Sequence, residues 1–293
     1  MQNKRTCILY KRAGPGEGIM ENKEKVKNPA SAMERVCRTP WESWLPPFRI
    51  APHVYSVSGN DWVCSYLIDT GAGLILIDTA MHESCYLLLE SIRMLGFDYH
   101  DIRLILLSHA HCDHIGAART LKELTGAKLY LGKRDLFFLT ARRDLIFTEN
   151  YTCGEFMPDE FYDYSAPIRL GNTAIQPVAT PGHTPGCTSF FFTAEDTDGS
   201  RYRLGMHGGI GLNTLSKEFL EENNLPVTLQ KEFLGNLEML DEKEIDICLP
   251  SHFNQVPVIE KIPADRNDFS PFIDHAVFHE LLHKRMNMIK ELM

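Results

Sequence analysis

Short runs of apolar residues, separated by glycine-rich turns, dominate the chain from residue 53 onward. Residues 64–69 and 74–78 flank the turn Gly71-Ala72-Gly73, a pattern typical of a β-hairpin. Residues 103–107 form another apolar run, and a helical pattern that Gly126 closes follows it. The first half of the chain therefore predicts strands at 54–57, 64–69, 74–78, 103–107 and 127–131, with helices at 86–94, 115–125 and 133–143.

The second half repeats this order of strands, loops and helices. Strands are expected at 174–180, 187–193, 201–206 and 245–249, and helices within 217–241 and at 271–292. Residues 149–166 are rich in aromatic and acidic side chains without clear periodicity, so a flap over a site is possible there. Two similar halves of alternating strands and helices predict an α/β fold in one domain, with two sheets packed face to face and helices outside.

The first 40 residues follow a different pattern. The glycine-rich stretch 14–18 and a Lys/Glu run leave too little apolar surface to bury, which predicts a flexible basic segment over residues 1–40. The domain is then expected to span residues 41–293, beginning with Trp41 and Trp44 in an extended arm. A start at Met20 or Met33 would remove most of the basic segment.

The basic segment and the rest of the chain also differ in net charge. The 293 residues carry a formal net charge of −9, and residues 1–38 hold nine Lys/Arg against four Glu, a local +5, which leaves −14 for the rest. An acidic body argues against a nucleic-acid partner. For the basic end, a solvated tail is favoured over a membrane or RNA contact because no amphipathic pattern accompanies the charge.

Targeting signals and cysteine spacing indicate the cell compartment in which we expect the protein. No apolar run reaches the ~18 residues of a membrane span, and the amino end lacks the apolar core of a signal peptide. We therefore expect a cytoplasmic protein without membrane contact, or a periplasmic one if the true N-terminus differs. Eight cysteines without CxxC spacing predict reduced thiols rather than a disulfide framework. The sequence does not predict the oligomeric state.

Candidate chemistry is concentrated directly after the apolar run 103–107. His109, His111, Asp113 and His114 lie within six residues. Imidazole nitrogens and carboxylate oxygens are ligands that zinc prefers, so ordinary loop residues are the weaker interpretation. Because residues two apart aim the same way, His109 and His111 are expected at one metal ion. Asp113 and His114 point elsewhere and can serve a second ion.

Two further histidines stand at predicted strand ends. His183 lies in the turn 180–186, which reads TPGHTPG, and His252 follows Pro250-Ser251. Three histidines on one zinc leave a fourth position open for water, which is typical of a catalytic site. Asp113, His114 and one further histidine can hold the second ion.

These residues carry a resemblance to a known family. The set His109-x-His111-x-Asp113-His114, His183 and His252 resembles the ligands of the metallo-β-lactamase superfamily, and the resemblance runs from about Trp41 to the final helix. It implies an αββα metallo-β-lactamase sandwich with two zinc ions (Zn2+) per chain. It implies that the first zinc is held by His109, His111 and His183, and the second by Asp113, His114 and His252.

The choice of subfamily rests on missing ligands. Glyoxalase II-like, lactonase-like and phosphodiesterase-like members usually place a metal-bridging Asp at the end of the strand that here reads YRLGMHGG over 202–209, which has none. Two β-lactamase subclasses use a Cys ligand in this region, and no Cys occurs between Cys187 and Cys248. The chain most resembles the third class B subclass, whose ligands are all His and Asp. Where that subclass often presents serines that hold the substrate carboxylate, this chain has Gly208, Gly209 and Gly211.

The resemblance implies an activity. It predicts a hydrolase acting on a small molecule, a β-lactam whose ring amide is opened by a zinc-bound hydroxide that Asp113 orients, as in antibiotic resistance. The alternative is a cytoplasmic hydrolase of the same fold that cleaves another ester, lactone, thioester or phosphodiester. A non-catalytic metal-binding scaffold is a third interpretation, against which the complete ligand set argues.

Other residues are candidates for supporting roles. Asp78, at the end of an apolar strand, either fixes a ligand loop or is a plain turn residue. His207 is either a substrate contact at the pocket mouth or a structural residue at a strand end, and the structural role is favoured. Asn213 is a further candidate substrate contact. Cys112 is expected to point away from both metals. A polar stripe is favoured over a metal clamp for three helical histidines that show no evident carboxylate partner: His275, His279 and His283.

Overall fold

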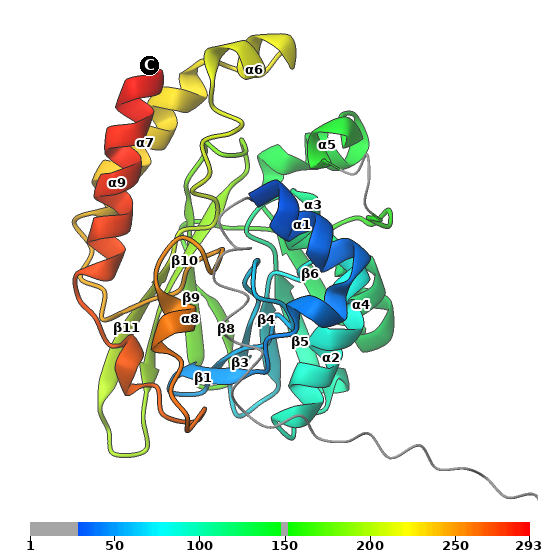
Figure 1. The fold of residues 1–293 in the computed structure, drawn as a ribbon, viewed down its shortest axis with the longest axis vertical. Helices are drawn as coiled ribbons and strands as arrows, with labels where there is room; N and C mark the ends of the chain where they lie inside the picture. The colour runs from blue at the N-terminus through cyan, green and yellow to red at the C-terminus, as the bar shows by residue number, and fades with distance from the viewer. Residues whose placement is uncertain (1–28, 148–151) are drawn as a thin grey trace, which may run out of the picture.

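The computed structural model of the protein describes residues 29–147 and 152–293. Two β-sheets form the centre of the described part of the chain (Figure 1). The first sheet runs in chain order, antiparallel from β1 to β4 and parallel from β4 to β7. Its strands are β1 (Phe48–Ala51), β2 (Val54–Ser56), β3 (Tyr66–Asp69), β4 (Leu74–Ile77), β5 (Ile102–Leu106), β6 (Lys128–Leu131) and β7 (Glu160–Phe161).

The second sheet has the order β12-β11-β10-β9-β8. Only the β11–β12 pair is parallel among these strands of the described chain. The strands are β8 (Ile168–Leu170), β9 (Thr173–Ala179), β10 (Thr188–Glu195), β11 (Arg201–Met206) and β12 (Ile247–Cys248). The predicted strands are therefore present, although 245–249 shortens to two residues.

The apolar runs bury both faces of the central strands. In β4, Ile75 and Ile77 belong to the core between the sheets, where they join Phe190 of β10. Leu74 and Leu76 belong to a different core, which the helices cover. A strand buried on both faces has a continuous apolar sequence rather than an alternating one, which explains the unbroken run LILI.

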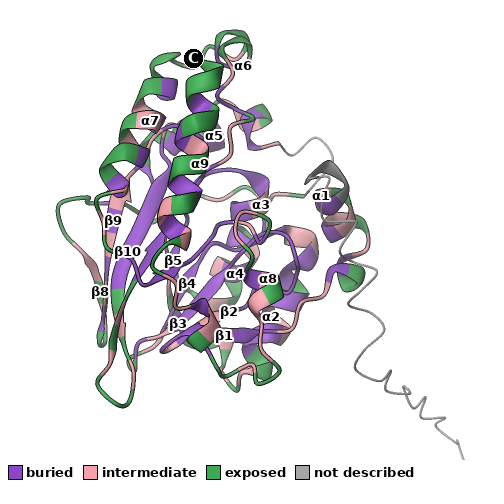
Figure 2. Cartoon of the chain, turned by 60° about the vertical axis from the view of Figure 1, so that its left-hand side comes forward, coloured by how far each residue is buried: buried purple, intermediate pink, exposed green. Residues whose placement is uncertain are grey.

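Four helices cover the outer faces of the sheets. α2 (Cys85–Met94) and α4 (Ala118–Thr125) pack on the first sheet, and α7 (Thr228–Leu240) and α9 (Val277–Leu292) on the second. In Figure 1 these pairs lie to the right and left of the strands. Figure 2 shows buried strands between helices whose outer faces are exposed. This arrangement is the predicted αββα sandwich, and no helix among the described residues is both long and apolar enough to cross a membrane.

Short helical segments connect these elements. The short α-helices are α1 (Pro29–Arg38), α3 (Cys112–Ile115), α5 (Leu136–Thr140), α6 (Lys217–Glu222) and α8 (Val258–Lys261). The 3₁₀ turns are η3 (Pro40–Ser43), η4 (His82–Ser84), η5 (Tyr99–Asp101), η6 (Lys133–Asp135), η7 (Arg143–Ile146) and η8 (Ser270–Phe272).

The prediction of a flexible segment over residues 1–40 is wrong for its last part. Residues 29–38 form α1, whose Ala32 and Val36 are buried against the first sheet's helical layer. Arg35 donates two hydrogen bonds to the carboxylate of Asp61, at 2.9 and 3.0 Å. This ion pair and the buried face attach α1 to the domain, which therefore begins before residue 41. Residues 1–28 lie outside the described part.

Three other expectations need correction. The helix expected at 133–143 is broken into η6, α5 and η7, and the final helix begins at Val277 rather than 271. The described part of the segment 149–166 contributes β7 to the first sheet instead of a flap. Tyr162, directly after β7, is buried and donates a hydrogen bond to the Leu107 carbonyl, which holds this segment against the sheet.

Candidate metal centre

Loops at three strand ends bring the predicted ligands together. The loop after β5 carries His109 and His111 and continues into α3, which includes Asp113 and His114. His183 lies in the turn between β9 and β10, and His252 follows β12, where it pairs with Val63 in an isolated β-bridge. Strand ends hold these loops rigidly because the strands themselves are fixed in the core.

His109, His111 and His183 form one group. Each offers a ring nitrogen, and these nitrogens all lie within 4.8 Å of one another. Nδ1 of His111 is 3.0 Å from Nε2 of His183. Nε2 of His109 is buried and has no hydrogen-bond partner among the described residues. A buried ring nitrogen without a partner is costly, so this group has the geometry of a metal site.

Asp113, His114 and His252 gather beside that group. Nε2 of His252 lies 3.2 Å from Nε2 of His114 and 3.3 Å from Oδ2 of Asp113. The latter oxygen is 3.5 Å from Nε2 of His114. A ring nitrogen of His109 also lies within 4.8 Å of ligand atoms of Asp113 and His114, so the two groups are adjacent.

The surroundings fix which ring nitrogen of each imidazole keeps its lone pair. The Gly211 carbonyl can only accept, so Nδ1 of His183, 3.0 Å away, carries the proton. In the same way, Nδ1 of His114 donates to the Asp78 carboxylate. The Ser108 hydroxyl donates its hydrogen to Asp78 and therefore accepts a hydrogen bond from Nδ1 of His109. Nε2 of these three rings is then left as a lone-pair donor to a metal.

The protonation states of the candidate ligands also favour metal binding. Burial lowers the pKa of His109 and His183 well below the ordinary value and that of His111 to about 4. Burial would raise the pKa of Asp113, but the neighbouring His114 and His252 outweigh it and lower it. Burial would lower the pKa of His114, but Asp113 and Asp78 outweigh it and raise it. The first group therefore offers neutral imidazoles and the second an ionised carboxylate, which are donors that suit zinc.

Asp78 supports both ligand groups. Its carboxylate accepts hydrogen bonds from the Ser108 backbone N–H at 2.7 Å, the Ser108 hydroxyl at 2.6 Å and His114 Nδ1 at 2.7 Å. The side chain is fully buried, unlike that of an ordinary turn residue. Asp78 thus orients His114 directly and His109 through Ser108.

Asp135 is a positioning residue that the sequence analysis did not single out. Its buried carboxylate accepts hydrogen bonds from Ala110 N at 2.9 Å, Thr184 Oγ1 at 2.7 Å and Gly186 N at 2.6 Å. These bonds tie the loop of His109 to the turn of His183. Burial outweighs the three donors and raises the pKa of Asp135 to about 6. Gly132, three residues before Asp135, was the signal in the sequence for this close approach. A Cβ at Gly132 would lie 1.9 Å from the Gly186 carbonyl oxygen, so a glycine is needed there.

The loop after β11 packs directly on His183. A Cβ at Gly209 would lie 2.7 Å from Cδ2 of His183, and one at Gly211 would lie 2.8 Å from its Cε1. Side chains are therefore excluded where the resemblance would place serines. His207 lies behind this loop against Phe233, buried and outside the pocket lining, which agrees with the structural role and excludes the place at the pocket mouth. Asn213 does line the pocket.

A cavity of about 680 Å³ opens over the two groups. This volume is within the range for small-molecule sites. Trp62, whose ring centroid is 5.0 Å from that of His252, forms one wall. Met33 of α1 forms another, so the segment expected to be flexible contributes to the site. Polar side chains of the lining, apart from the candidate ligands, are Asn213, Ser251, Asn254, Gln255 and Arg285.

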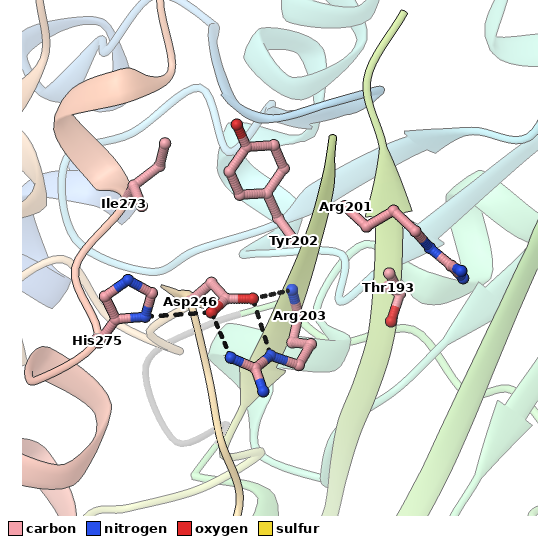
Figure 3. A pocket seen from close by; sticks show the side chains of 7 residues that line it. All are labelled: Thr193, Arg201, Tyr202, Arg203, Asp246, Ile273 and His275. Atoms are coloured by element: carbon pink, nitrogen blue, oxygen red, sulfur yellow. Dashed lines mark hydrogen bonds and ion pairs between the residues drawn. The ribbon is translucent and has the colours of Figure 1, made fainter. Parts of the chain in front are cut away.

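A second hollow, of about 480 Å³, lies beside β11 and β12 (Figure 3). Asp246 pairs there with Arg203 at 2.7 Å and with His275 at 3.1 Å. The expectation that the helical histidines lack a carboxylate partner is also wrong. Asp241, directly after α7, lies 2.8 Å from His279 and 2.7 Å from His283. His279 and His283 thus share the Asp241 carboxylate, whereas His275 contacts Asp246, so the three histidines do not form one site.

Cys112 does not join the ligands. Its Sγ donates a hydrogen bond to the Phe147 carbonyl at 3.2 Å, and burial raises its pKa, so the side chain stays a neutral thiol. Zinc binds the thiolate, not the thiol.

Comparisons with known proteins support the fold. The family model of the metallo-beta-lactamase superfamily matches residues 63–197. The structure of the metallo-beta-lactamase GOB-18 from Elizabethkingia meningoseptica is 30% identical, with a TM-score of 0.76 over 87% of this chain and 94% of that chain. BJP-1, a subclass B3 metallo-beta-lactamase of Bradyrhizobium japonicum, is 26% identical, with a TM-score of 0.76 over 87% of this chain and 96% of that chain.

A curated relative extends the comparison. The uncharacterized protein YobT of Bacillus subtilis (strain 168) is 30% identical over 153 residues, which are 50% of this chain and 64% of YobT. The chain thus spans less than two thirds of the length of this relative. The likeness to GOB-18, in contrast, extends over nearly the whole of that enzyme, and it shows that this chain belongs to the metallo-β-lactamase superfamily.

Proposed function

We propose that the protein is a di-zinc hydrolase that opens the amide bond of β-lactam rings. The observation that carries this proposal is the convergence of six side chains beneath a cavity of about 680 Å³. The names of GOB-18 and BJP-1 describe metallo-beta-lactamases and support the same reaction. A ring amide bound in the cavity would lie directly over these side chains.

The residues present fit two zinc ions. His109, His111 and His183 would hold one, and Asp113, His114 and His252 would hold the other. The unpartnered Nε2 of His109 and the facing nitrogens of His114 and His252 are the features that support this assignment. Bound zinc supplies a Lewis acid and a water of lowered pKa.

The chain's own residues would then position the reactants. Asp113 stays ionised at neutral pH because its histidine neighbours lower its pKa, so its carboxylate can accept a hydrogen bond from the attacking water and orient it. Asp78 and Asp135 hold the ligand loops in place. Trp62 and Phe147 form apolar walls, which would limit the water beside a bound substrate and strengthen the electrostatic interactions there.

A second candidate function is hydrolysis of another ester, lactone, thioester or phosphodiester by the same centre. The glycine loop favours this candidate, because Gly209 and Gly211 pack on His183 and offer no side chain to a β-lactam carboxylate. The metal centre and the pocket walls would keep the same roles.

Hydrolysis of a chromogenic cephalosporin by the zinc-loaded protein tests the first candidate. We expect a kcat/KM on the order of 10⁴ M⁻¹ s⁻¹ or more, lost after chelation and regained with added zinc. His183→Ala is the matched negative control. No turnover by protein that holds two zinc ions would contradict β-lactam hydrolysis. A panel of ester, lactone, thioester and phosphodiester substrates would then test the second candidate.

A further inference from the structure

The cavity over the candidate ligands, called the metal pocket below, contains one cation in its wall that has no counter-charge within residues 29–147 and 152–293. Arg285 of α9 lines the pocket, and its Nε is buried without a hydrogen-bond partner among the described residues. Within the same residues its guanidinium forms no ion pair, and its one hydrogen-bond contact is from Nη1 to the Met288 sulfur at 3.8 Å. Most of its hydrogen-bonding capacity is therefore unused.

Two other partly buried arginines of this protein have acidic partners, and two more, Arg143 and Arg266, donate hydrogen bonds to backbone carbonyls. Arg35 pairs with Asp61 at 2.9 Å, and Arg49 pairs with Asp196 at 2.9 Å. Burying a cation without such a partner is unfavourable, and burial accordingly lowers the pKa of Arg285. A fold keeps an unpaired cation of this kind at a cost in stability, which is typical of a binding group.

The ionisable side chain beside Arg285 does not neutralise it. Burial, together with the positive charge of Arg285, lowers the pKa of His207 to about 3, so this imidazole is neutral at physiological pH. Nε2 of His207 is also buried without a partner among the described residues. In the part of the chain that the structure describes, His207 therefore supplies no negative charge to Arg285.

The loop that packs on His183 cannot replace such an anchor. Side chains at Gly209 and Gly211 would collide with the His183 ring, so this wall presents backbone alone. An anion in the pocket must therefore find its positive partner on another element. Arg285 of α9 meets this requirement, and its planar guanidinium matches a carboxylate with two parallel hydrogen bonds.

We propose that Arg285 anchors the carboxylate of the substrate while the scissile bond lies at the metal centre. This inference rests on the proposed hydrolase function, and it defines the substrate class as carboxylate-bearing molecules. Neutral esters, lactones or lactams of the same shape bind more weakly. Arg285 acts on substrate affinity rather than on bond cleavage.

Binding of ω-mercapto carboxylic acids with two to six carbons tests the proposal, each compared with its neutral amide. The thiol of each probe binds zinc, and the chain length varies the reach of the carboxylate. Isothermal titration calorimetry on the zinc-loaded protein measures affinity without turnover. We expect at least one acid to bind ~10-fold more tightly than its amide, which corresponds to about 1.4 kcal/mol.

Three variants assign that preference to Arg285. Arg285→Met should reduce it to less than twofold, whereas Arg285→Lys, which keeps the charge but loses the guanidinium fork, should retain part of it. Lys284→Met removes one charge from an exposed position of the same helix and should leave the preference unchanged. Arg285→Met should also fold normally because it removes no ion pair.

The outcomes of these binding experiments test the Arg285 anchor separately from β-lactam hydrolysis. No acid preference in the wild type at any chain length, or a preference that survives Arg285→Met, would overturn the anchor. A preference that Arg285→Met removes supports the anchor even when the chromogenic cephalosporin is not hydrolysed, and that result would overturn only the β-lactam assignment.

Discussion

The metal pocket and the hollow beside β11 and β12 differ in whether their polar groups are satisfied. Beside β11 and β12, Arg203 and His275 both pair with Asp246, so the charges of that hollow neutralise one another (Figure 3). In the metal pocket, Nε2 of His109 and Nε of Arg285 have no partner among the described residues. Groups that stay unpaired in the fold are the ones available to a ligand. We therefore expect substitutions in the metal pocket to change zinc binding and turnover, and substitutions in the hollow beside β11 and β12 to change stability.

Removal of a candidate ligand should have the largest effect. His183→Ala removes one nitrogen of the first group and should lower the zinc affinity of that group, and the turnover, by more than the roughly 100-fold typical of supporting residues. His275→Ala, in the other hollow, is the control and should change neither. Zinc content measured by mass spectrometry and initial rates would check both variants, and an active His183→Ala protein would refute the ligand assignment.

Loss of a supporting carboxylate should rank next. Asp78→Ala leaves Ser108 and His114 without their shared acceptor, so zinc affinity should fall roughly 10–100-fold. Competition with a chromophoric chelator measures this affinity. Asp246→Ala also removes a buried acceptor with several donors, and it should leave zinc affinity unchanged. Equal losses in the two variants would mean that Asp78 acts on stability alone.

The ion pair of α1 should affect mainly stability. Arg35→Ala leaves the buried carboxylate of Asp61 unpaired and should lower the free energy of unfolding by about 3 kcal/mol. Arg38→Ala, which breaks an exposed pair with Glu34 on the same helix, should cost less than about 0.5 kcal/mol. Urea unfolding curves compare the two. Similar unfolding curves for the two variants would mean that the Arg35–Asp61 pair of α1 does not stabilise the domain.

The smallest effect is expected in the second hollow. A hydrogen bond from Arg203 lowers the pKa of Asp246 from 3.8 to about 2. Its ionised form therefore adds stability above pH 3.8 that is lost as the pH falls toward 2. Asp246→Asn should cost on the order of 1 kcal/mol at pH 7 and remove this pH dependence. Unfolding measured between pH 2 and 7 checks the sign, and zinc content should not change.

The sequence predicted the sandwich and its ligand-bearing loops for clear physical reasons. Unbroken apolar runs such as 74–77 identify strands that are buried on both faces. Histidines as dense as His109, His111 and His114 are rare outside metal sites, and His183 and His252 stand at strand ends. These signals are local, so they need no knowledge of the tertiary structure.

The parts that the sequence did not predict depend on distant contacts. Arg35 meets Asp61 only in the folded chain, so α1 could not be recognised as attached. Asp135 becomes a positioning residue because the turn 180–186 folds against it. The expected helix at 133–143 is broken where Arg142 donates hydrogen bonds to Asn223, 81 residues away. Helix propensity alone does not contain such interactions.

Zinc stoichiometry tests the central claim, that these six residues form two adjacent metal sites, most directly. The purified protein should be saturated with zinc, dialysed and analysed by mass spectrometry, together with His252→Ala. The proposed sites predict two zinc ions per wild-type chain and one per His252→Ala chain, because the variant keeps His109, His111 and His183. A wild type without bound zinc, or equal zinc content in both proteins, would contradict it.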